Sequence, residues 1–189
     1  MPKNTKTVVL IGPDDENFWP VFKRSPEILD GTSDPLDRWS KRVIDPWAND
    51  IGATALYPSD GPPYPPFIAW AKASSTLEQS PVGLFVHAKA GLFVSFRAAL
   101  ALPYELSTKQ TTPPPCDSCI PQPCRRVCPV NALKGDYYDV AACHAHLATD
   151  AGADCMAKGC RARRACPVSQ ACGRVDEQSA FHMKAFFKP

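Results

Sequence analysis

The chain has 189 residues, which is enough for one compact domain or for two small ones. Its 21 lysines and arginines nearly balance its 19 aspartates and glutamates, so the net charge of +2 gives no indication of nucleic-acid binding or of a membrane surface. The most apolar segment (82–102) is interrupted by His87, Lys89 and Arg97, which excludes a membrane helix, and "TVVLIG" near the N-terminus is too short for the apolar part of a signal peptide. We therefore expect a soluble, cytoplasmic protein.

Short strands and helices are expected at the start of the chain. The β-branched run "VVLIG" (Val8–Gly12), which ends in Gly-Pro, predicts a strand, and "ATALYP" (53–58) predicts a second one. In "SDPLDRWSKRVI" (33–44) a capping residue and an early proline precede apolar residues at helical spacing, and Pro46 is expected to kink or end this helix. These apolar residues are Leu36, Trp39, Val43 and Trp47.

Two further elements are expected before the first cysteine. "PFIAWAKAS" (66–74) predicts a short helix. Two apolar runs on either side of "HAKAG", between Val82 and Val94, predict a β-hairpin that leads into "FRAALAL" (96–102). Together these elements predict a small α+β region over residues 1–106.

All nine cysteines lie between Cys116 and Cys172, after "STKQTTPPP", a polar, proline-stiffened segment that disfavours both helix and strand. The sequence therefore predicts three parts: an α+β region over residues 1–106, a connector over residues 107–115 and a cysteine-rich module over residues 116–189. In the reducing compartment expected here, clustered cysteines indicate metal binding or catalysis rather than disulfides.

The first four cysteines have the spacing C-x2-C-x4-C-x3-C-P, from Cys116 to Pro129. Iron–sulfur proteins carry the similar run C-x2-C-x2-C-x3-C-P, so this segment differs by two residues inserted between the second and third cysteines. A structural zinc site instead uses two close pairs separated by a longer gap, and its motifs have no role for the proline. The spacing favours an iron–sulfur cluster over zinc, and both over disulfides.

A half-repeat indicates two clusters. "CIPQPCRRVCPV" (Cys119–Val130) and "CMAKGCRARRACPVS" (Cys155–Ser169) both contain C-x4-C-R, and both close with C-P-V. Cys116 leads the first half. Cys143 is the candidate for the same place in the second half, early in a helix for which Asp139 is the expected cap. Each half then offers four cysteines, as two [4Fe–4S] clusters require.

In two-cluster ferredoxins, the cysteine of each Cys-Pro pair binds the cluster of the other half. This rule predicts that Cys166 joins the first cluster and Cys128 the second, so that the crossed ligands hold the halves together. The predicted ligands are Cys116, Cys119, Cys124 and Cys166 for cluster 1, and Cys128, Cys143, Cys155 and Cys160 for cluster 2.

Three residues close to these ligands have two interpretations each. His144 and His146 are candidate ligands because they adjoin Cys143, but we expect them to face solvent or to form hydrogen bonds. Cys172 is expected to be a small buried apolar residue. It would be the substitute ligand if Cys143 does not bind.

The segment Cys116–Ser169, with "CDSCIPQPCRRVCPVNAL", "CHAHL" and "GADCMAKGCRARRACPV", resembles the two-cluster module of bacterial ferredoxins. More narrowly, it resembles the C-terminal module of epoxyqueuosine reductases and reductive dehalogenases, in which an isolated cysteine also lies well upstream of a compact group. Those enzymes pair the module with a cobalamin-binding domain, and residues 80–102 are similar to the last hairpin of that domain. The resemblance implies a ferredoxin-like module, and no residue here corresponds to a catalytic acid of those enzymes.

Three candidate functions follow from these observations. The first is a ferredoxin-like electron carrier with two [4Fe–4S] clusters and a redox partner protein, without chemistry beyond one-electron transfer. The alternative is a small cobalamin- or flavin-binding reductase, related to epoxyqueuosine reductase, whose clusters feed a cofactor in the N-terminal region. A zinc-stabilised binding module is a third candidate. The residues proposed to line a cofactor cleft are Trp39, Trp47, Tyr57, Trp70 and His87.

Two further features bear on the clusters. The basic segment "CRARRAC" places Arg161, Arg163 and Arg164 between two predicted ligands, where they would attract an acidic partner, raise a cluster potential or simply face solvent. The aromatic and proline-rich residues 1–106 are expected to form a layer that packs on one cluster and shields it from water.

Overall fold

The computed structural model describes residues 1–107 and 113–187, which form two compact units. Of these residues, unit 1 comprises 1–75 and 95–107, and unit 2 comprises 76–94 and 113–187. This division differs from the predicted one, because residues 76–94 join the cysteine-rich module instead of the N-terminal region. Most of the predicted connector, residues 108–112, lies outside the described residues.

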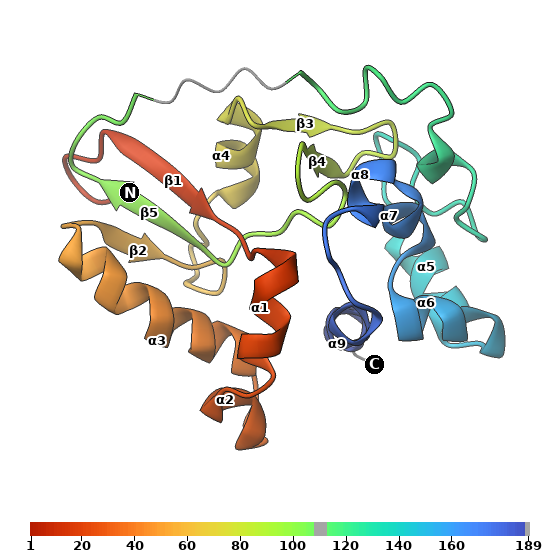
Figure 1. Ribbon diagram of the computed structural model, residues 1–189, viewed down its shortest axis with the longest axis horizontal. Coiled ribbons are helices and arrows are strands. Elements are labelled where there is room, and N and C mark those ends of the chain that lie inside the picture. Colours follow the sequence, from red (N-terminus) through yellow and green to blue (C-terminus); the bar gives the residue numbers. More distant parts are fainter. Residues whose placement is uncertain (108–112, 188–189) are drawn as a thin grey trace. The chain divides into compact units, whose positions relative to one another are not determined.

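Unit 1 is built on a three-stranded antiparallel sheet with the order β1-β5-β2 (Figure 1). β1 (Thr7–Ile11) and β2 (Thr54–Leu56) confirm the two strands predicted from "VVLIG" and "ATALYP". β5 (Ala98–Leu102) lies between them, with Leu100 opposite a residue of each neighbour, and all five of its residues are buried. Burial along the whole strand explains its uninterrupted apolar sequence.

α3 (Pro35–Asp50) covers one face of this sheet and confirms the predicted helix. Its buried residues recur every fourth position: Leu36, Ser40, Ile44 and Ala48. Ile44 and Ala48 pack with Leu100 of β5. Val43 and Trp47, which helped to predict the helix, are exposed, so the buried face is rotated by one residue from the expected one.

Pro46 lies inside α3, and the expectation that it ends the helix is wrong. Proline removes one backbone hydrogen bond and crowds the preceding turn. Tertiary contacts of the last turn offset this cost, because Ala48 is 2% exposed and the Asp45 carboxylate accepts a 2.6 Å hydrogen bond from the Tyr57 hydroxyl. Packing therefore outweighs the local preference at Pro46.

The aromatic residues of α1 (Asp15–Phe22) pack against α3. Phe18 and Phe22 stack with ring centroids 5.5 Å apart, and both meet Trp39 edge to face, at 5.4 and 5.7 Å. α4 (Phe67–Ala73), which packs near β1, confirms the short helix predicted from "PFIAWAKAS". Much of the aromatic content of this region is thus a packed core.

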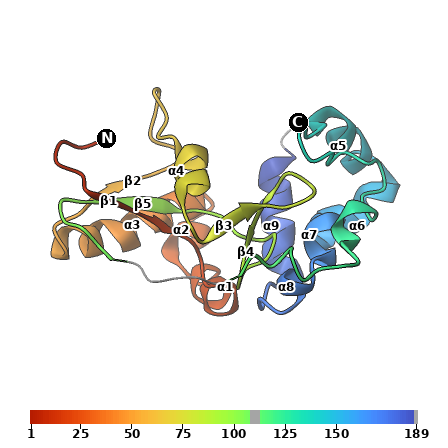
Figure 2. The same ribbon diagram turned by 90° about the horizontal axis from the view of Figure 1, so that it is seen from above.

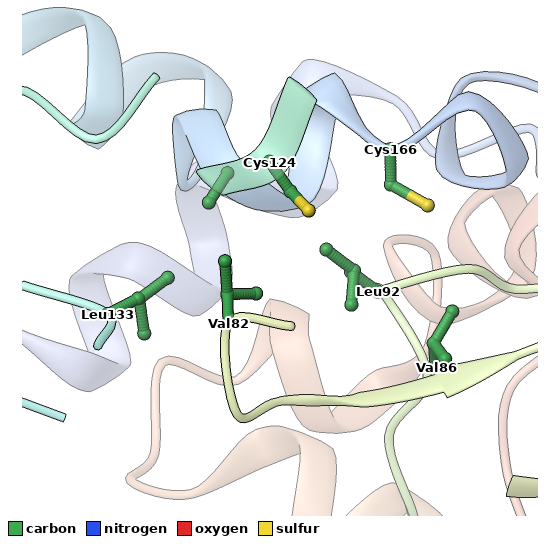
Figure 3. Packing of buried hydrophobic residues seen from close by; sticks show 7 residues of the cluster. Val82, Val86, Leu92, Cys124, Leu133 and Cys166 are labelled. Atoms are coloured by element: carbon green, nitrogen blue, oxygen red, sulfur yellow. The ribbon is translucent and has the colours of Figure 1, made fainter. Parts of the chain in front are cut away.

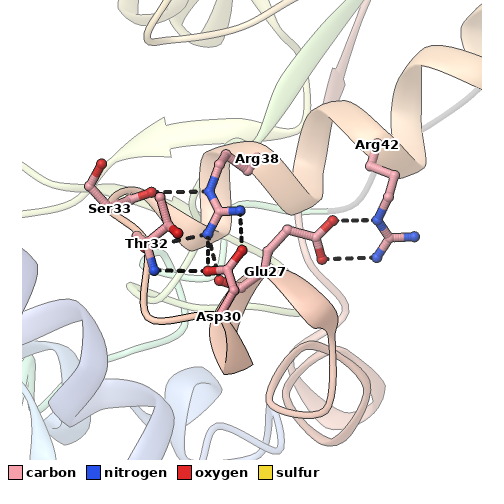
Figure 4. Close-up of polar contacts among 6 residues, drawn as sticks. All are labelled: Glu27, Asp30, Thr32, Ser33, Arg38 and Arg42. Atoms are coloured by element: carbon pink, nitrogen blue, oxygen red, sulfur yellow. Dashed lines mark hydrogen bonds and ion pairs between the residues drawn. The ribbon is translucent and has the colours of Figure 1, made fainter.

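Two arginines of α3 hold α2 (Pro26–Leu29) and the turn that follows it (Figure 4). Arg42 donates to both carboxylate oxygens of Glu27, and Arg38 donates to both carboxylate oxygens of Asp30 at 2.7 Å. These hydrogen bonds lower the pKa of each carboxyl group to about 2. We call the four side chains the α2–α3 clamp.

Unit 2 begins with a β-hairpin in which β3 (Leu77–Gln79) pairs with β4 (Phe85–His87). Of the hairpin predicted between Val82 and Val94, one antiparallel bridge is present, between His87 and Gly91 on either side of the "HAKAG" turn. The longer pairing joins β3 to β4 instead. Burial rather than strand pairing accounts for the apolar character of this segment. Its most deeply buried residues are Val82, Val86 and Leu92, each at most 2% exposed.

The rest of unit 2 consists of short helices (Figures 1 and 2). They are η1 (Pro123–Arg125), α5 (Val140–Leu147), η2 (Asp150–Gly152), α6 (Ala153–Lys158), α7 (Arg161–Ala165), α8 (Pro167–Gln170) and α9 (Asp176–Phe186). α9 packs on α6, and η1 packs against α7. Because η1 and α7 belong to different halves of the cysteine repeat, the two halves lie side by side.

The core of unit 2 joins the hairpin segment to the cysteine loops (Figure 3). Its buried members are Val82, Val86, Leu92, Cys124, Leu133, Ala162 and Cys166. Burying an aliphatic side chain of this size contributes about 1.5–3 kcal/mol. Residues 76–94 therefore supply a substantial part of the stability of the cysteine-rich unit.

Helices account for 41% of the structure and strands for 12%, which confirms the predicted α+β class. Across residues 1–107 and 113–187, no helix is both long and apolar enough to span a membrane.

Candidate functional site

None of the nine cysteines, all of which lie in the described part of the chain, forms a disulfide. In the first half of the repeat, Cys116 and Cys119 lie in the turns before η1, Cys124 lies in η1, and Cys128 follows it. In the second half, Cys143 lies in α5, Cys155 in α6, Cys160 just before α7, and Cys166 between α7 and α8. α7 thus has a predicted ligand of a different cluster at each of its ends.

Four thiols, which we call group one, lie within electrostatic range of one another. Burial raises the pKa of Cys116 to about 11, and the negative charges that raise it further belong to Glu78 and to three cysteines. These are Cys124, Cys166 and Cys119. Cys166 comes from the second half of the repeat, so the structure brings together the four residues predicted for cluster 1.

Group one lines a cavity of about 220 Å³. The hairpin segment and the cysteine loops supply its apolar walls: Pro81, Val86, Leu92, Pro115, Pro121, Pro123 and Pro167. Figure 3 shows Cys124 and Cys166 on the same side of the packed cluster, facing Val82, Leu92 and Val86. Because proline has no N–H, these loops enclose the thiols without adding backbone donors at those positions.

The other four predicted ligands form group two. Burial has the largest effect on Cys143 and raises its pKa. The Tyr138 hydroxyl donates to the Cys143 sulfur at 3.4 Å and lowers the pKa, whereas the charges of three further thiols raise it. These are Cys160, Cys128 and Cys155. Cys128 comes from the first half of the repeat, so each group takes three cysteines from one half and one from the other.

The helix that carries Cys143 begins as predicted. The Asp139 carboxylate accepts a 2.9 Å hydrogen bond from the N–H of Ala142, which caps α5. Cys143 therefore lies in the first turn of α5, where the orientation of the peptide dipoles favours a thiolate.

Backbone amides point at several sulfur atoms. The N–H of Ala132 donates to Cys128 Sγ at 3.3 Å. Burial raises the pKa of Cys155, and a hydrogen bond from the N–H of Arg161 opposes this rise. Hydrogen bonds to sulfur stabilise the thiolate, so they suit a metal-bound cysteine.

The three arginines of the basic segment have different partners. Arg161 and Arg164 both bind the carboxylate of Asp154, Arg161 at 2.9 Å. Arg163 donates instead to the backbone carbonyl of Leu92. Since two of the three cations are paired within unit 2, the segment offers less free charge for an acidic partner than its sequence indicates.

The candidate ligands His144 and His146 are half-buried rather than solvent-facing. The ring of His144 packs edge-on against Phe186 and Phe187, with centroids 4.7 and 5.4 Å away. Neither Nε2 atom has a hydrogen-bond partner in the part of the chain that the structure describes. The neighbouring side chains that shift the pKa of Cys143 are Tyr138 and three cysteines, and neither His144 nor His146 is among them.

Cys172 is half-buried, less enclosed than expected. Its thiol donates to the carbonyl of Ser169 at 3.1 Å. It is not among the thiols that shift the pKa of Cys116 or of Cys143.

The five residues proposed to line a cofactor cleft are not brought to one place. Trp39 packs on Phe18 and Phe22, Trp70 packs on Phe67, and the Tyr57 hydroxyl donates to Asp45. Trp47 is 46% exposed, and His87 belongs to unit 2, where its Nδ1 accepts from the N–H groups of Lys89 and Ala90.

Within residues 1–107 and 113–187, no three His, Cys, Asp or Glu side chains converge as a single metal ion requires. A [4Fe–4S] cluster has no such requirement, because its four cysteines bind four different iron atoms. No protein-family model, curated protein or solved structure is significantly similar to the chain.

Sequence reasoning missed three residues near the thiols, and no motif marks them. The charge of Glu78 acts on Cys116, Leu92 packs with Cys124 and Cys166, and the Tyr138 hydroxyl donates to Cys143. A weak signal exists for Tyr138, which precedes the α5 cap at Asp139 directly.

Proposed function

We propose that unit 2 holds two [4Fe–4S] clusters and that the protein is an electron-transfer protein. The observation that carries this proposal is the gathering of eight thiols into two groups of four, each with one member from the other half of the repeat. Four cysteines are the ligand set of a [4Fe–4S] cluster. Such a cluster, when bound, supplies one-electron transfer.

The residues of unit 2 have three roles in this proposal. Cys160 and Cys166, at the two ends of α7, bind different clusters, so that this short helix joins them. The hairpin segment keeps water from group one through Val86 and Leu92. Donors such as the Tyr138 hydroxyl stabilise the thiolates and tune the reduction potentials.

A carrier of this kind exchanges electrons with a redox partner protein. Cysteines persist as thiols in a reducing compartment, and the cytoplasm would suit this site for that reason. A cobalamin or flavin would make the protein a reductase instead. The aromatic residues considered for such a cofactor pack in separate places, so the electron carrier is the function that the site supports best.

Iron and acid-labile sulfide analysis of anaerobically purified protein, together with its absorbance spectrum, tests the proposal. We expect about eight irons and about eight sulfides per chain, the content of two cubane clusters. About four irons would leave a single cluster. A colourless protein that contains zinc would contradict the proposal, and corrin or flavin bands would favour the reductase.

Two variants sharpen the iron measurement. Cys143→Ser removes a predicted ligand of group two and should lose about four irons. Cys172→Ser should retain the full iron content, because a serine hydroxyl can replace the hydrogen bond of the thiol to the Ser169 carbonyl. Loss of iron in Cys172→Ser but not in Cys143→Ser would make Cys172 the ligand.

A further inference from the structure

Arg163 has an environment unlike that of its neighbours in the basic segment. Arg161 and Arg164 share the carboxylate of Asp154, and the Arg161 side chain is 41% exposed. Arg163 donates to the carbonyl of Leu92 and, among the described residues, forms no ion pair with a carboxylate. It retains some exposed surface, yet its guanidinium is deep enough for burial to lower its pKa.

The Arg163 guanidinium lies beside group two. Cys160 and Arg163 are three residues apart at the start of α7, a spacing that places them on one face of a helix. The other groups whose charges act on Arg163 are Arg174 and Tyr138, and the Tyr138 hydroxyl donates to Cys143 of group two. One thiol of group two, Cys160, thus acts on the cation, and no thiol of group one is among the groups whose charges act on it.

The position of Arg163 is fixed by the segment that it binds. The N–H of Leu92 donates to Ser169 Oγ at 2.8 Å. At Gly91, which has a φ of +55°, a Cβ would lie 2.4 Å from the backbone nitrogen of Ser169, so that the two segments are in close contact. A poorly solvated cation without a carboxylate is destabilising unless another anion balances its charge. Thiolates that bind iron would supply that charge.

Group one has the opposite environment. Glu78, on β3, acts on Cys116 as a negative charge. Burial raises the pKa of Glu78, and the charge of Asp117 raises it further, so a second carboxylate lies on the same side. Within the described residues, no cation is among the charges that act on Cys116. At group two, the carboxylate of Asp154 acts on Cys155, but it is paired with Arg161 and Arg164, and Arg163 adds a further cation.

We propose that Arg163 is a positioning residue that makes the cluster of group two easier to reduce than the cluster of group one. This inference rests on the proposed function. A low-potential one-electron reductant donates one electron, which makes the cluster and its thiolates one unit more negative, while no bond or proton changes place. A fixed cation stabilises the added charge, and a carboxylate opposes it. With both clusters bound, an added electron would therefore be more stable at group two than at group one.

The test is an anaerobic redox titration followed by electron paramagnetic resonance and visible absorbance. Wild-type protein should show two one-electron steps, and Cys143→Ser, which should lose the cluster of group two, should lack the more positive step. Arg163→Gln should lower the equilibrium constant of that step about tenfold, equivalent to about 59 mV for one electron. The other step should stay in place. Arg163→Lys, which keeps the charge, should retain most of the wild-type potential.

Lys158→Gln is the matched control, because it removes one positive charge from an exposed side chain that is paired with Asp154. It should change the equilibrium constant less than about twofold, since solvent and salt screen exposed charges. Equal shifts in the two glutamine variants, an Arg163→Lys shift as large as that of Arg163→Gln, or coincident steps in wild-type protein would overturn the inference.

If Arg163→Gln does not bind iron, Glu78→Gln tests the same asymmetry from the other side. Removal of this carboxylate should raise the potential of the lower step, and an unchanged lower step would overturn the inference. Iron content separates the two proposals. Wild-type protein without clusters would refute the proposed function, whereas two clusters whose potentials do not respond to these charges would refute the asymmetry alone.

Discussion

Cys166 stands where α7 ends and α8 begins, with Pro167 as the first residue of α8. Its side chain is 8% exposed, and its charge acts on Cys116 and Cys124, which lie much earlier in the chain. Cys166→Ala should therefore damage the cluster of group one, with the loss of about four of the eight irons.

Iron analysis and electron paramagnetic resonance of Cys166→Ala check this expectation. Cys155→Ala is the matched variant, because Cys155 belongs to the same half of the repeat but to group two. The two variants should retain different clusters. If both lose the same cluster, ligation is local and the crossed arrangement is wrong.

The sequence predicts the grouping of the cysteines better than it predicts their surroundings. Spacing and the C-P-V repeat predict two sets of four cysteines, and the structure places the thiols in those sets. The charges next to them are not predictable in the same way. "CRARRAC" is uniformly basic, and the fold distinguishes its arginines through Asp154, which pairs with two of them, and Leu92, which accepts from the third.

At the scale of elements, the α2–α3 clamp should make unit 1 sensitive to acid. The pKa of Glu27 falls from 4.5 to about 2 in the folded protein, chiefly through its hydrogen bond from Arg42, and that of Asp30 falls from 3.8 to about 2 through Arg38. The unfolded chain thus binds protons more readily than the folded one. The clamp stabilises unit 1 fully above about pH 4.5 and loses this effect as the pH falls towards 2.

Urea unfolding followed by tryptophan fluorescence measures this effect, because all four tryptophans lie in unit 1. Between about pH 5 and about pH 3, the range in which Glu27 would begin to bind protons, the free energy of unfolding of the wild-type protein should fall. Glu27→Gln should reduce this fall, because it removes one of the two titrating groups. Glu16→Gln, on the exposed part of α1, should keep the wild-type pH dependence. Identical pH profiles for all three proteins would contradict the role of the clamp.

The turn between β3 and β4 depends on Gly83. Its φ is +80°, and a Cβ there would lie 2.1 Å from the carbonyl oxygen of Gly135. Gly83→Ala should therefore destabilise unit 2 by more than the backbone strain of about 1–2 kcal/mol, because the hairpin must also move away from Gly135.

Thermal unfolding followed by circular dichroism compares Gly83→Ala with Gly52→Ala. Gly52 has a similar φ of +65°, but a Cβ there would meet nothing within 4 Å, so this variant isolates the backbone strain. The Gly83 variant should show the larger decrease in its transition midpoint. Equal decreases would mean that the contact with Gly135 does not hold the hairpin.

The elements that could be predicted are those whose pattern reflects local geometry. β1, β2, α3 and α4 follow from β-branched runs, proline positions and helical spacing. The predicted hairpin is limited to the bridge between His87 and Gly91, because Val82 and Leu92 are apolar for a tertiary reason: they are buried against the cysteine loops. Pro46 misleads for a similar reason, since the contacts of Ala48 stabilise the helix beyond it.

At the scale of the molecule, the chain alternates between the two units. Residues 76–94 leave unit 1, contribute a hairpin to unit 2 and are followed by β5, the central strand of the unit-1 sheet. The sequence predicts that residues 1–106 together form a layer that shields a cluster. Of these residues, the ones that line the cavity of group one all belong to 76–94. Deletion of residues 1–106 would therefore remove part of the unit-2 core as well.

A fragment test follows from this arrangement. In the first fragment, residues 76–94 are joined to residues 113–189 by a Gly/Ser linker that replaces residues 95–112. It should bind about eight irons. The second fragment contains residues 113–189 alone and should lose the cluster of group one first, because its cavity lacks the wall formed by Pro81, Val86 and Leu92.

The half-life of cluster absorbance in air distinguishes these fragments from each other and from the whole chain. Loss of Val82, Val86 and Leu92 from the core should cost about 1.5–3 kcal/mol for each side chain, so the second fragment should also be the less stable protein. If the two fragments lose cluster at the same rate, the hairpin is not the shield. If the first fragment loses cluster absorbance much faster than the whole chain does, unit 1 also contributes to the stability of the clusters in air.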